Sequence, residues 1–508
     1  MNIESYKKCS SAISLQGREK SVRKSSIRAA LQYLQNHPNT SLSELATSLD
    51  FSNHTSKKII TDLQSDILAF NLESSFSLHF ENNLVTLVSP PHKNIIIWLR
   101  HYVRNSIEYK LLEACFLMTH DNIDDFADEY FISPTSVYRV RKKLENILEK
   151  YQITISTNLR FEGQEVSIRS FLFEMYFKFF GENLPFDCET NAAIEEGIAR
   201  IENIIGGPKF KFTQVQKIKV KYVYYIVFAR MAQGKNPSQQ LQTDPRFKKI
   251  LMRWPEHTID GLSNAILAKF PNLPEEDAKL ESYMMLRYLY SEAMLPDSPE
   301  WDAIVLENTV ISNLNNLFIN EFGRYFKLDA TKSETIFSKT VCDSLSRLHS
   351  RLYFFEYTNA DYIFDPSDTI ALHQYNDYMQ FASQMTNIIT PSFSHNRKRV
   401  TSNQAGIMYD YLFLMMTTIP LELVNPPFHV VFEFSQGANF DLLVKSLFKD
   451  RPNANIVVER HITENTLLFV SDINVQDLDV PFQLQWHMPP TAADWSALED
   501  ILAIPVTT

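Results

Sequence analysis

Two groups of hydrogen-bonding and basic side chains occupy the first turns of predicted helices that begin at residues 53 and 134. Short polar side chains can reach base edges in the major groove of a duplex, and Arg and Lys can pair with its phosphates. Their spacing therefore predicts contact with double-stranded DNA. The candidate DNA-contacting residues are His54, Thr55, Ser56, Lys57, Lys58, Thr135, Ser136, Tyr138, Arg139, Arg141, Lys142 and Lys143.

The second group is positioned by a helix-turn-helix pattern. Residues 124–131 are expected to form a short helix, and Ser133 has the character of an N-cap for the next helix, with Pro134 at its first position. The apolar stripe of that next helix consists of Val137, Val140, Leu144, Ile147 and Leu148. One such pattern alone also fits a solvated amphipathic helix in a helical domain, but the pattern occurs twice.

The earlier copy begins with a helix from Ile27 to Leu34 and continues with a helix capped by Ser41, where Glu44 completes a capping box. The helix at 53–68 follows, and its apolar stripe consists of Ile59, Ile60, Leu63 and Ile67. Residues 75–80 and 84–88 then alternate around a turn, which predicts a β-hairpin. Three helices followed by a hairpin are typical of a winged helix-turn-helix.

The later copy repeats this order about 80 residues on. A helix is expected around 105–119, the helix pair within 121–151, and a second wing from strands at 153–159 and 166–168 around a turn at 162–165. Tandem copies of one order favour a DNA-binding function over chance amphipathicity.

The rest of the chain is expected to be helical up to a small α/β end, with one of the clearest helices at 336–354. The expected strands of that end lie at 429–434, 456–458 and 467–470, with a helix at 440–448. The predicted fold is mainly α and multidomain. Its expected domains are a first winged helix-turn-helix with an N-terminal arm (1–90), a second winged helix-turn-helix (91–170), two helical bundles (171–296 and 297–424) and an α/β domain with a parallel sheet (425–508).

Composition and motifs exclude several classes of protein. The net charge is −11, yet residues 1–170 hold 20 Lys and Arg against 19 Asp and Glu, so the acidic excess does not exclude a DNA-binding front end. The cysteines occur singly, which predicts no disulfide and no metal site and favours a reducing cytoplasm. Neither a signal peptide nor a membrane span is expected. Nucleotide-loop, zinc-protease and nucleophile-elbow motifs are absent, so we expect no cofactor and no enzymatic activity.

The order of these domains resembles the Mga/AtxA family of virulence-associated transcriptional regulators of Gram-positive bacteria. The most specific segments are 132–153 (ISPTSVYRVRKKLENILEKYQI), 161–173 (FEGQEVSIRSFLF) and 432–440 (FEFSQGANF). The resemblance implies that the two bundles are phosphotransferase-system regulation domains (PRDs) and that the end domain is similar to a phosphotransferase-system (PTS) enzyme IIB. It also implies binding to promoter DNA and self-association, partly through the C-terminal domain.

The chain departs from the family where phosphotransfer chemistry is implied. The helices at 214–234 and 401–418, where the family carries phosphoacceptor histidines, contain none. His257, His349 and His373 are the remaining candidates, and a surface or capping role is expected for each. The nucleophilic Cys of enzyme IIB corresponds to Phe434 or Ser435, so the end domain is expected to be a scaffold for dimerisation.

Together these features favour a cytoplasmic, non-enzymatic transcriptional regulator, of the global or virulence-type activator class, that binds promoter DNA as a homodimer or larger assembly. Thr135, Ser136, Tyr138 and Arg139 are expected nearest the bases or flanking phosphates, and Arg141, Lys142 and Lys143 on the backbone. The alternative is a PTS phosphorelay-linked sensor or adaptor that acts through protein contacts. PTS proteins are candidate partners in either case, and no membrane partner is expected.

Overall fold

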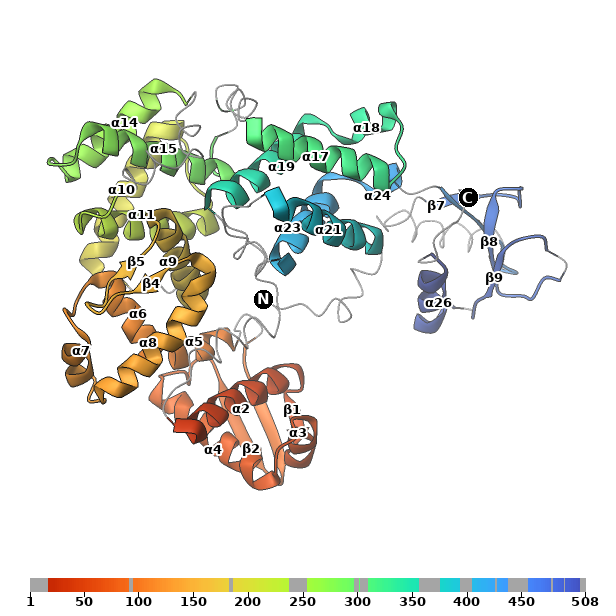
Figure 1. The fold of residues 1–508 in the computed structure, drawn as a ribbon. Coiled ribbons are helices and arrows are strands. Elements are labelled where there is room, and N and C mark those ends of the chain that lie inside the picture. Colours follow the sequence, from red (N-terminus) through yellow and green to blue (C-terminus); the bar gives the residue numbers. More distant parts are fainter. Residues whose placement is uncertain are drawn as a thin grey trace. The chain divides into compact units, whose positions relative to one another are not determined.

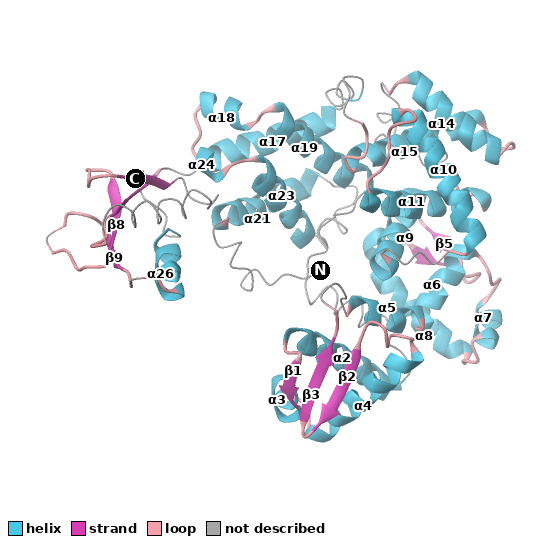
Figure 2. Ribbon diagram, turned by 180° about the vertical axis from the view of Figure 1, so that it is seen from behind, coloured by secondary structure: helices cyan, strands magenta, loops and turns pink. Residues whose placement is uncertain are grey.

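The computed structural model describes residues 17–90, 95–181, 186–236, 254–296, 301, 309–355, 375–392, 404–424, 427–436, 456–476, 478–487 and 489–502. The chain divides into two compact units, one made mainly of residues 3–289 and the other mainly of residues 298–508. Helices dominate both, and the described strands form three small sheets (Figure 1, Figure 2). The prediction of a mainly α, multidomain chain is confirmed.

The first helix-turn-helix consists of α2 (Gly17–Asn36), α3 (Leu42–Ser48) and α4 (Asn53–Ala69), followed by the hairpin β2 (Ser77–Glu81) and β3 (Leu84–Val88). The predicted stripe of α4 is buried, and Ile60, Leu63 and Val85 of this core are 0% exposed. A short strand, β1 (Asn39–Ser41), adds to β3, so the sheet order is β1-β3-β2, all antiparallel. Three residues are too few for a visible alternation, so the sequence pattern did not predict β1.

The second helix-turn-helix consists of α5 (Ile96–Arg104), α6 (Ile107–Leu117), α7 (Ile123–Glu129) and α8 (Pro134–Leu148), closed by the 3-10 turn η1 (Glu149–Tyr151). Its wing is the short antiparallel pair β4 (Thr154–Ile155) and β5 (Phe161–Glu162).

The predicted position of this second wing was wrong. The chain turns at 156–160, not at 162–165, and residues 166–168 lie in helix α9 (Glu165–Phe180) instead of a strand. An apolar–polar–apolar triplet fits the start of a buried helix as well as a strand. Val166, Ile168, Leu172 and Tyr176 are all buried, because α9 is buried on nearly every side in its first turns.

A helical bundle completes the compact unit made mainly of residues 3–289. Beyond α9 it contains α10 (Cys188–Gly206), α11 (Gln214–Ala232), α14 (Glu256–Lys269) and α15 (Glu275–Ser291). A capping box of Thr213 and Gln216 starts α11, and Gly234, at φ +70°, follows its end.

The compact unit made mainly of residues 298–508 begins with a second set of helices. These are α17 (Thr309–Tyr325), α18 (Ala330–Ile336), α19 (Lys339–Ser350), α21 (Asn376–Ile389), α23 (Gln404–Thr418) and α24 (Leu421–Val424). The π-helical turn η3 (Arg351–Phe355) follows α19 directly. The continuous helix expected from 336 to 354 is divided, because Ile336 ends α18 and the chain turns before Lys339. Aromatic rings fill the core, with Phe318, Phe322 and Phe381 fully buried.

The chain ends in a parallel sheet of β6 (Phe428–Phe432), β7 (Ile456–Glu459), β8 (Thr466–Ser471) and β9 (Phe482–Gln485), with helix α26 (Ala492–Leu502). Its strand order is β7-β6-β8-β9, and every neighbouring pair is parallel, which confirms the predicted sheet type. The helix expected at 440–448 lies outside the described residues. Among the described helices, none combines the length and apolarity needed to cross a lipid bilayer.

Candidate nucleic-acid interface

The two helix-turn-helix units share one capping geometry, at positions 81 residues apart. The Ser52 hydroxyl accepts the N–H of Thr55 at 3.1 Å, and the Ser133 hydroxyl accepts the N–H of Ser136 at 3.2 Å. The paired hydroxyl oxygens lie 2.8 Å apart in the first unit and 2.9 Å apart in the second. Each cap satisfies an otherwise unbonded N–H and so sets the residue at which α4 or α8 begins.

The turns before these caps also match. Asp50 and Phe131 occupy corresponding positions with φ values of 54° and 51°, in the left-handed region. In each unit the next amide donates to a carbonyl five residues back, at 2.8 Å in the first unit and 3.0 Å in the second. The same backbone path in both copies supports the inference of a tandem repeat.

Each second helix presents one exposed face opposite its buried stripe. The exposed residues follow the spacing i, i+3, i+4, i+7, and the two sets occupy corresponding positions. They are His54, Lys57, Lys58 and Thr61 on α4, and Thr135, Tyr138, Arg139 and Lys142 on α8. We call these two sets the exposed faces of α4 and α8.

Three of the serine and threonine candidates lie in the helix caps or in the core instead of on the exposed faces. Ser56 is 0% exposed, because it occupies the position of the buried Val137 in the second unit, and its assignment to DNA was wrong. The hydroxyls of Thr55 and Ser136 are engaged at the caps. The sequence placed all three in the first turns correctly but did not separate the exposed face from the cap and the core.

Two of the basic candidates pair with acids. The Nε of Arg141 donates to Glu145 at 3.0 Å, and Lys143 Nζ lies 3.6 Å from a carboxylate oxygen of Glu108, whose side chain is 0% exposed. Both cations are partly buried, at 20% and 24% exposure. Lys143 thus compensates a buried carboxylate of α6, and the expectation that it lies on the DNA backbone is not supported by this geometry.

The histidine candidates differ from one another. His257 is exposed in the first turn of α14, while His373 lies outside the described residues. His349 is 0% exposed, so the expected surface or capping role was wrong. Its Nδ1 lies 2.6 Å from Asn315 Oδ1 and its Nε2 2.8 Å from the Tyr411 hydroxyl, so neither ring nitrogen is accessible to a phosphate donor.

Comparison with known protein families gives a match in the second helix-turn-helix unit. Residues 93–176, from the approach to α5 into α9, match the family model of the Mga helix-turn-helix domain. The second helix-turn-helix unit is therefore similar to an Mga helix-turn-helix domain, and we call residues 93–176 the Mga domain. The match extends beyond β5 and covers most of helix α9.

Two relatives extend the similarity beyond the Mga domain. The chain is 26% identical over 249 residues to the capsule synthesis positive regulator AcpB of Bacillus anthracis, which covers 48% of this chain and 50% of that protein. It is also 26% identical over 149 residues to a protein named as a trans-acting regulator from Streptococcus pneumoniae serotype 4, covering 28% of this chain and 29% of that protein. Each match thus spans half or less of the relative's own length. They confirm the resemblance to Mga/AtxA-like regulators, and the domain boundaries and DNA contacts stay predictions.

Phe131 of the Mga domain provides a stability prediction. Its side chain is 96% exposed, so its ring contributes little to packing, yet its backbone is left-handed. Asn tolerates this conformation better than other side chains with a Cβ. We expect Phe131→Asn to raise the free energy of unfolding by about 0.5–1 kcal/mol in urea denaturation. Phe131→Ala, which removes the ring but not the strain, is the matched control, and an equal gain in both variants would show that the backbone is not the cause.

Proposed function

We propose that this protein is a non-enzymatic transcriptional regulator of the cytoplasm that binds double-stranded promoter DNA through both helix-turn-helix units. The observation that carries the proposal is the pair of exposed faces of α4 and α8, which repeat the same polar and basic spacing 81 residues apart. The relatives named as regulators support the same function, and the positive regulator among them favours activation. We further propose that the two bundles are PRD-like regulatory domains and that the parallel-sheet domain mediates dimerisation.

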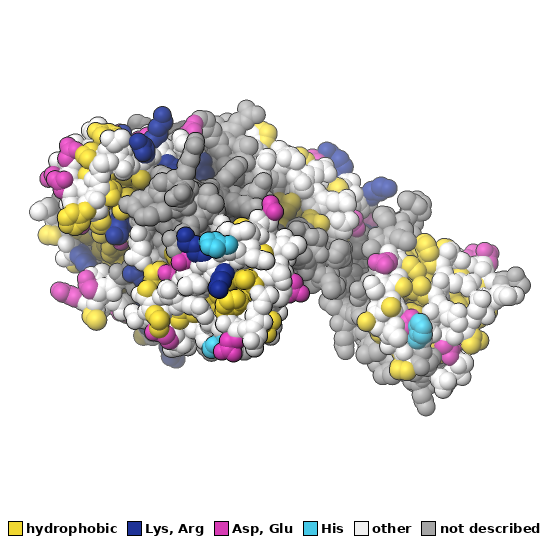
Figure 3. All heavy atoms as spheres, turned by 90° about the horizontal axis from the view of Figure 1, so that it is seen from below, with side chains coloured by type: hydrophobic (Ala, Val, Ile, Leu, Met, Phe, Trp, Pro, Cys, Tyr) yellow, Lys and Arg dark blue, Asp and Glu magenta, His cyan; other side chains and the backbone are white. Residues whose placement is uncertain are grey.

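The exposed face of α8 fits the chemistry of groove recognition. Thr135, Tyr138 and Arg139 lie in its first two turns, where a recognition helix meets base edges, and an Arg can bind guanine through two hydrogen bonds. Lys142, one turn further on, is placed to pair with a phosphate. Because Arg141 and Lys143 pair with acids, we expect affinity to rest on few phosphate contacts. On the face of the molecule drawn in Figure 3, basic side chains are likewise interspersed with acidic and apolar ones.

The salt dependence of DNA binding tests the proposal. Removing one cation that pairs with a phosphate should reduce the slope of log affinity against log salt by about 0.9. The double variant Arg139→Ala with Lys142→Ala should therefore flatten the slope by about 0.9 through Lys142 and lower the affinity further through the lost base contact of Arg139. The measurement is a fluorescence-anisotropy titration, at several salt concentrations, on the DNA upstream of the protein's own gene.

The matched control removes two exposed helix-surface cations from the second set of helices, Arg324→Ala with Lys332→Ala. This control should keep the original slope. If the slope of the α8 variant also stays unchanged, the exposed face of α8 does not dock on DNA and the proposed function is wrong.

The alternative, a PTS phosphorelay adaptor, gains no support from the histidines. His349 is enclosed by its two hydrogen-bond partners, and of the three candidates only His257 is exposed within the described part of the chain. Incubation with the general PTS proteins and labelled phosphoenolpyruvate separates the two functions, since label on His257 would favour the adaptor.

A further inference from the structure

A cavity of about 340 Å³ lies within the first bundle, between α10, α11, α14 and α15. Its walls are mainly apolar. Tyr224 and Phe228 of α11 stack with ring centroids 3.9 Å apart and form an aromatic wall, and Leu262 and Met285 contribute from the neighbouring helices. This volume and this lining are typical of sites for small organic ligands.

One wall depends on a glycine. A Cβ atom at Gly197 of α10 would lie 2.3 Å from both the Cζ and the hydroxyl oxygen of Tyr224, so any larger residue would push the Tyr224 ring away. The ring therefore keeps its place only because α10 carries Gly at this position.

Two cations line the cavity, Lys269 and Arg200. Lys269 Nζ lies 5.5 Å from the ring centroid of Tyr224 and 5.1 Å from that of Phe228, and Lys269 forms no ion pair with a described residue. Arg200 pairs with Glu196 at 3.2 Å, but both side chains are more than half exposed, so this pair is weak. Two cations in the lining favour a ligand that carries a negative charge.

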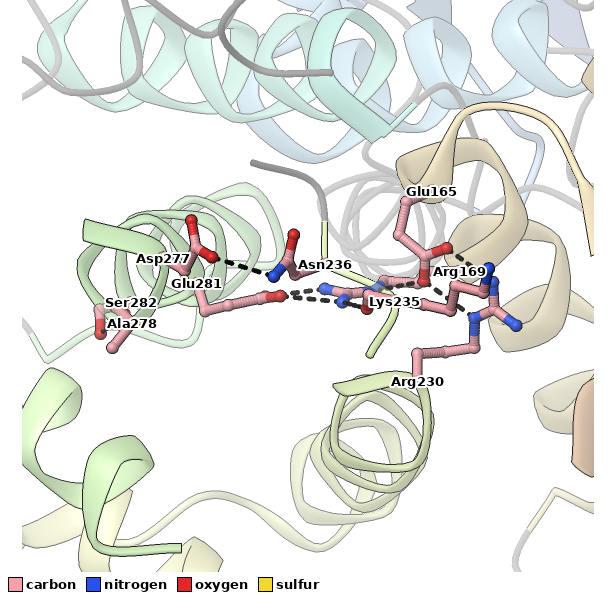
Figure 4. A network of polar contacts seen from close by, with 9 residues as sticks. All are labelled: Glu165, Arg169, Arg230, Lys235, Asn236, Asp277, Ala278, Glu281 and Ser282. Atoms are coloured by element: carbon pink, nitrogen blue, oxygen red, sulfur yellow. Dashed lines mark hydrogen bonds and ion pairs between the residues drawn. The ribbon is translucent and has the colours of Figure 1, made fainter. Parts of the chain in front are cut away.

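The two acidic residues of the cavity lining, Glu196 and Glu281, are each paired with an arginine, Arg200 and Arg169. Both carboxylate oxygens of Glu281 accept hydrogen bonds from Arg169, at 2.7 and 2.8 Å, so its charge is compensated (Figure 4). The neighbouring Ser282 hydroxyl donates to the Ala278 carbonyl of its own helix at 2.8 Å. The charge left available in the cavity is therefore positive.

We propose that this cavity binds a small amphipathic organic anion. An aromatic or aliphatic body packs on Tyr224 and Phe228, and a carboxylate, phosphate or sulfonate group pairs with Lys269 and Arg200. This site goes beyond the proposed DNA-binding function and does not depend on it, because ligand binding is measured without DNA.

The test uses the whole chain and 8-anilinonaphthalene-1-sulfonate, an aromatic anion whose fluorescence rises in apolar sites. We expect saturable binding of one molecule per chain. Ala265→Phe, which fills the cavity, should weaken binding by at least about tenfold, and Lys269→Gln by about threefold to tenfold. The neutral analogue N-phenyl-1-naphthylamine should bind the original protein about tenfold more weakly than the sulfonate.

Matched controls are Ala199→Phe, on the exposed face of α10, and Lys209→Gln, neither of which lines the cavity. Both should bind the sulfonate like the original protein. Far-ultraviolet circular dichroism and melting curves establish whether each variant folds. If Ala265→Phe does not fold, Ala268→Phe replaces it, because Ala268 lies at an exposed part of the cavity lining. Unchanged binding in a folded cavity-filling variant, or no saturable binding to the original protein, overturns the site. Equal affinity for the neutral analogue would contradict the proposal that the cavity selects an anionic ligand.

Discussion

Glu165→Ala is expected to destabilise the unit containing both helix-turn-helix copies by about 3–5 kcal/mol. Glu165 is the first residue of α9, and its two carboxylate oxygens accept hydrogen bonds from Arg230 at 2.9 and 2.7 Å. Arg230 is 2% exposed, so the variant leaves a buried guanidinium without its carboxylate. Urea denaturation followed by tryptophan fluorescence measures the decrease in stability.

The control for this decrease is Glu275→Ala, which removes an acid of α15 whose partner, Lys279, lies one turn away with both side chains exposed. It should cost less than about 1 kcal/mol. Replacing both charges, in Glu165→Met with Arg230→Met, should recover much of the stability, because no uncompensated charge then remains buried. A double variant as unstable as Glu165→Ala would mean that the removal of hydrogen bonds, and not an unpaired charge, causes the effect.

The expected decrease is large because Glu165 belongs to a network that joins three helices. Arg169 of α9 donates to Glu165 at 3.0 Å and to Glu281 of α15 at 2.7 and 2.8 Å, while Arg230 comes from the end of α11 (Figure 4). Burial alone would lower the pKa of Arg169, but Glu281 and then Glu165 hold it above its ordinary value. The network therefore ties the helix that leaves the Mga domain to the bundle that follows it.

The sequence predicted well those features of the structure that depend only on neighbouring residues, which are the helix caps and the buried stripes of the helices. The predicted caps Ser41 and Ser133 act within three residues of themselves, and both form in the structure. Their hydrogen bonds need no partner from elsewhere in the chain, so residue type and spacing are sufficient to predict them. The stripes of α4 and α8 were predicted for the same reason, since helical period decides which residues share a face.

The prediction errors arose at residues whose environment is set by a partner far away in the sequence. Lys143 was assigned to the DNA backbone because its partner Glu108 lies on another helix, and nothing in the sequence indicates that Glu108 is buried. The pairing of Glu165 with Arg230 spans 65 residues, and nothing in the spacing of either residue indicates it. Charged residues are usually exposed, so a pattern-based prediction assigns them to the surface unless the partner is known.

His349 is the clearest such case, and it leads to the second large effect. Between pH 8 and pH 5 the unit containing α19 is expected to lose about 2 kcal/mol of stability through this residue alone. Burial lowers the pKa of His349 from its ordinary value of 6.5 to about 3. Below pH 6.5 the unfolded chain therefore binds a proton that the folded chain does not, so stability falls as the pH falls and continues to fall towards pH 3.

The hydrogen bonds around the ring agree with a neutral imidazole. Asn315 Oδ1 can only accept, so Nδ1 carries the proton, and Nε2 accepts from the Tyr411 hydroxyl. Burial, and then the charge of Asp410, raises the pKa of Tyr411 well above its ordinary value, so this hydroxyl keeps its proton across the range. A second proton on His349 would leave an imidazolium N–H facing a donor in a site closed to water.

His349→Gln tests this directly, because an amide can donate to Asn315 and accept from Tyr411 but does not titrate. The variant should lose about 2 kcal/mol less than the original protein between pH 8 and pH 5, measured by denaturant unfolding, with hydrogen exchange of the α19 amides identifying the unit that responds. His257→Gln, at an exposed position, is the control and should leave the pH dependence attributed to His349 in place. If His349→Gln and the original protein weaken equally on acidification, the ring is not held neutral by its enclosure, and the acid sensitivity of this unit has another source.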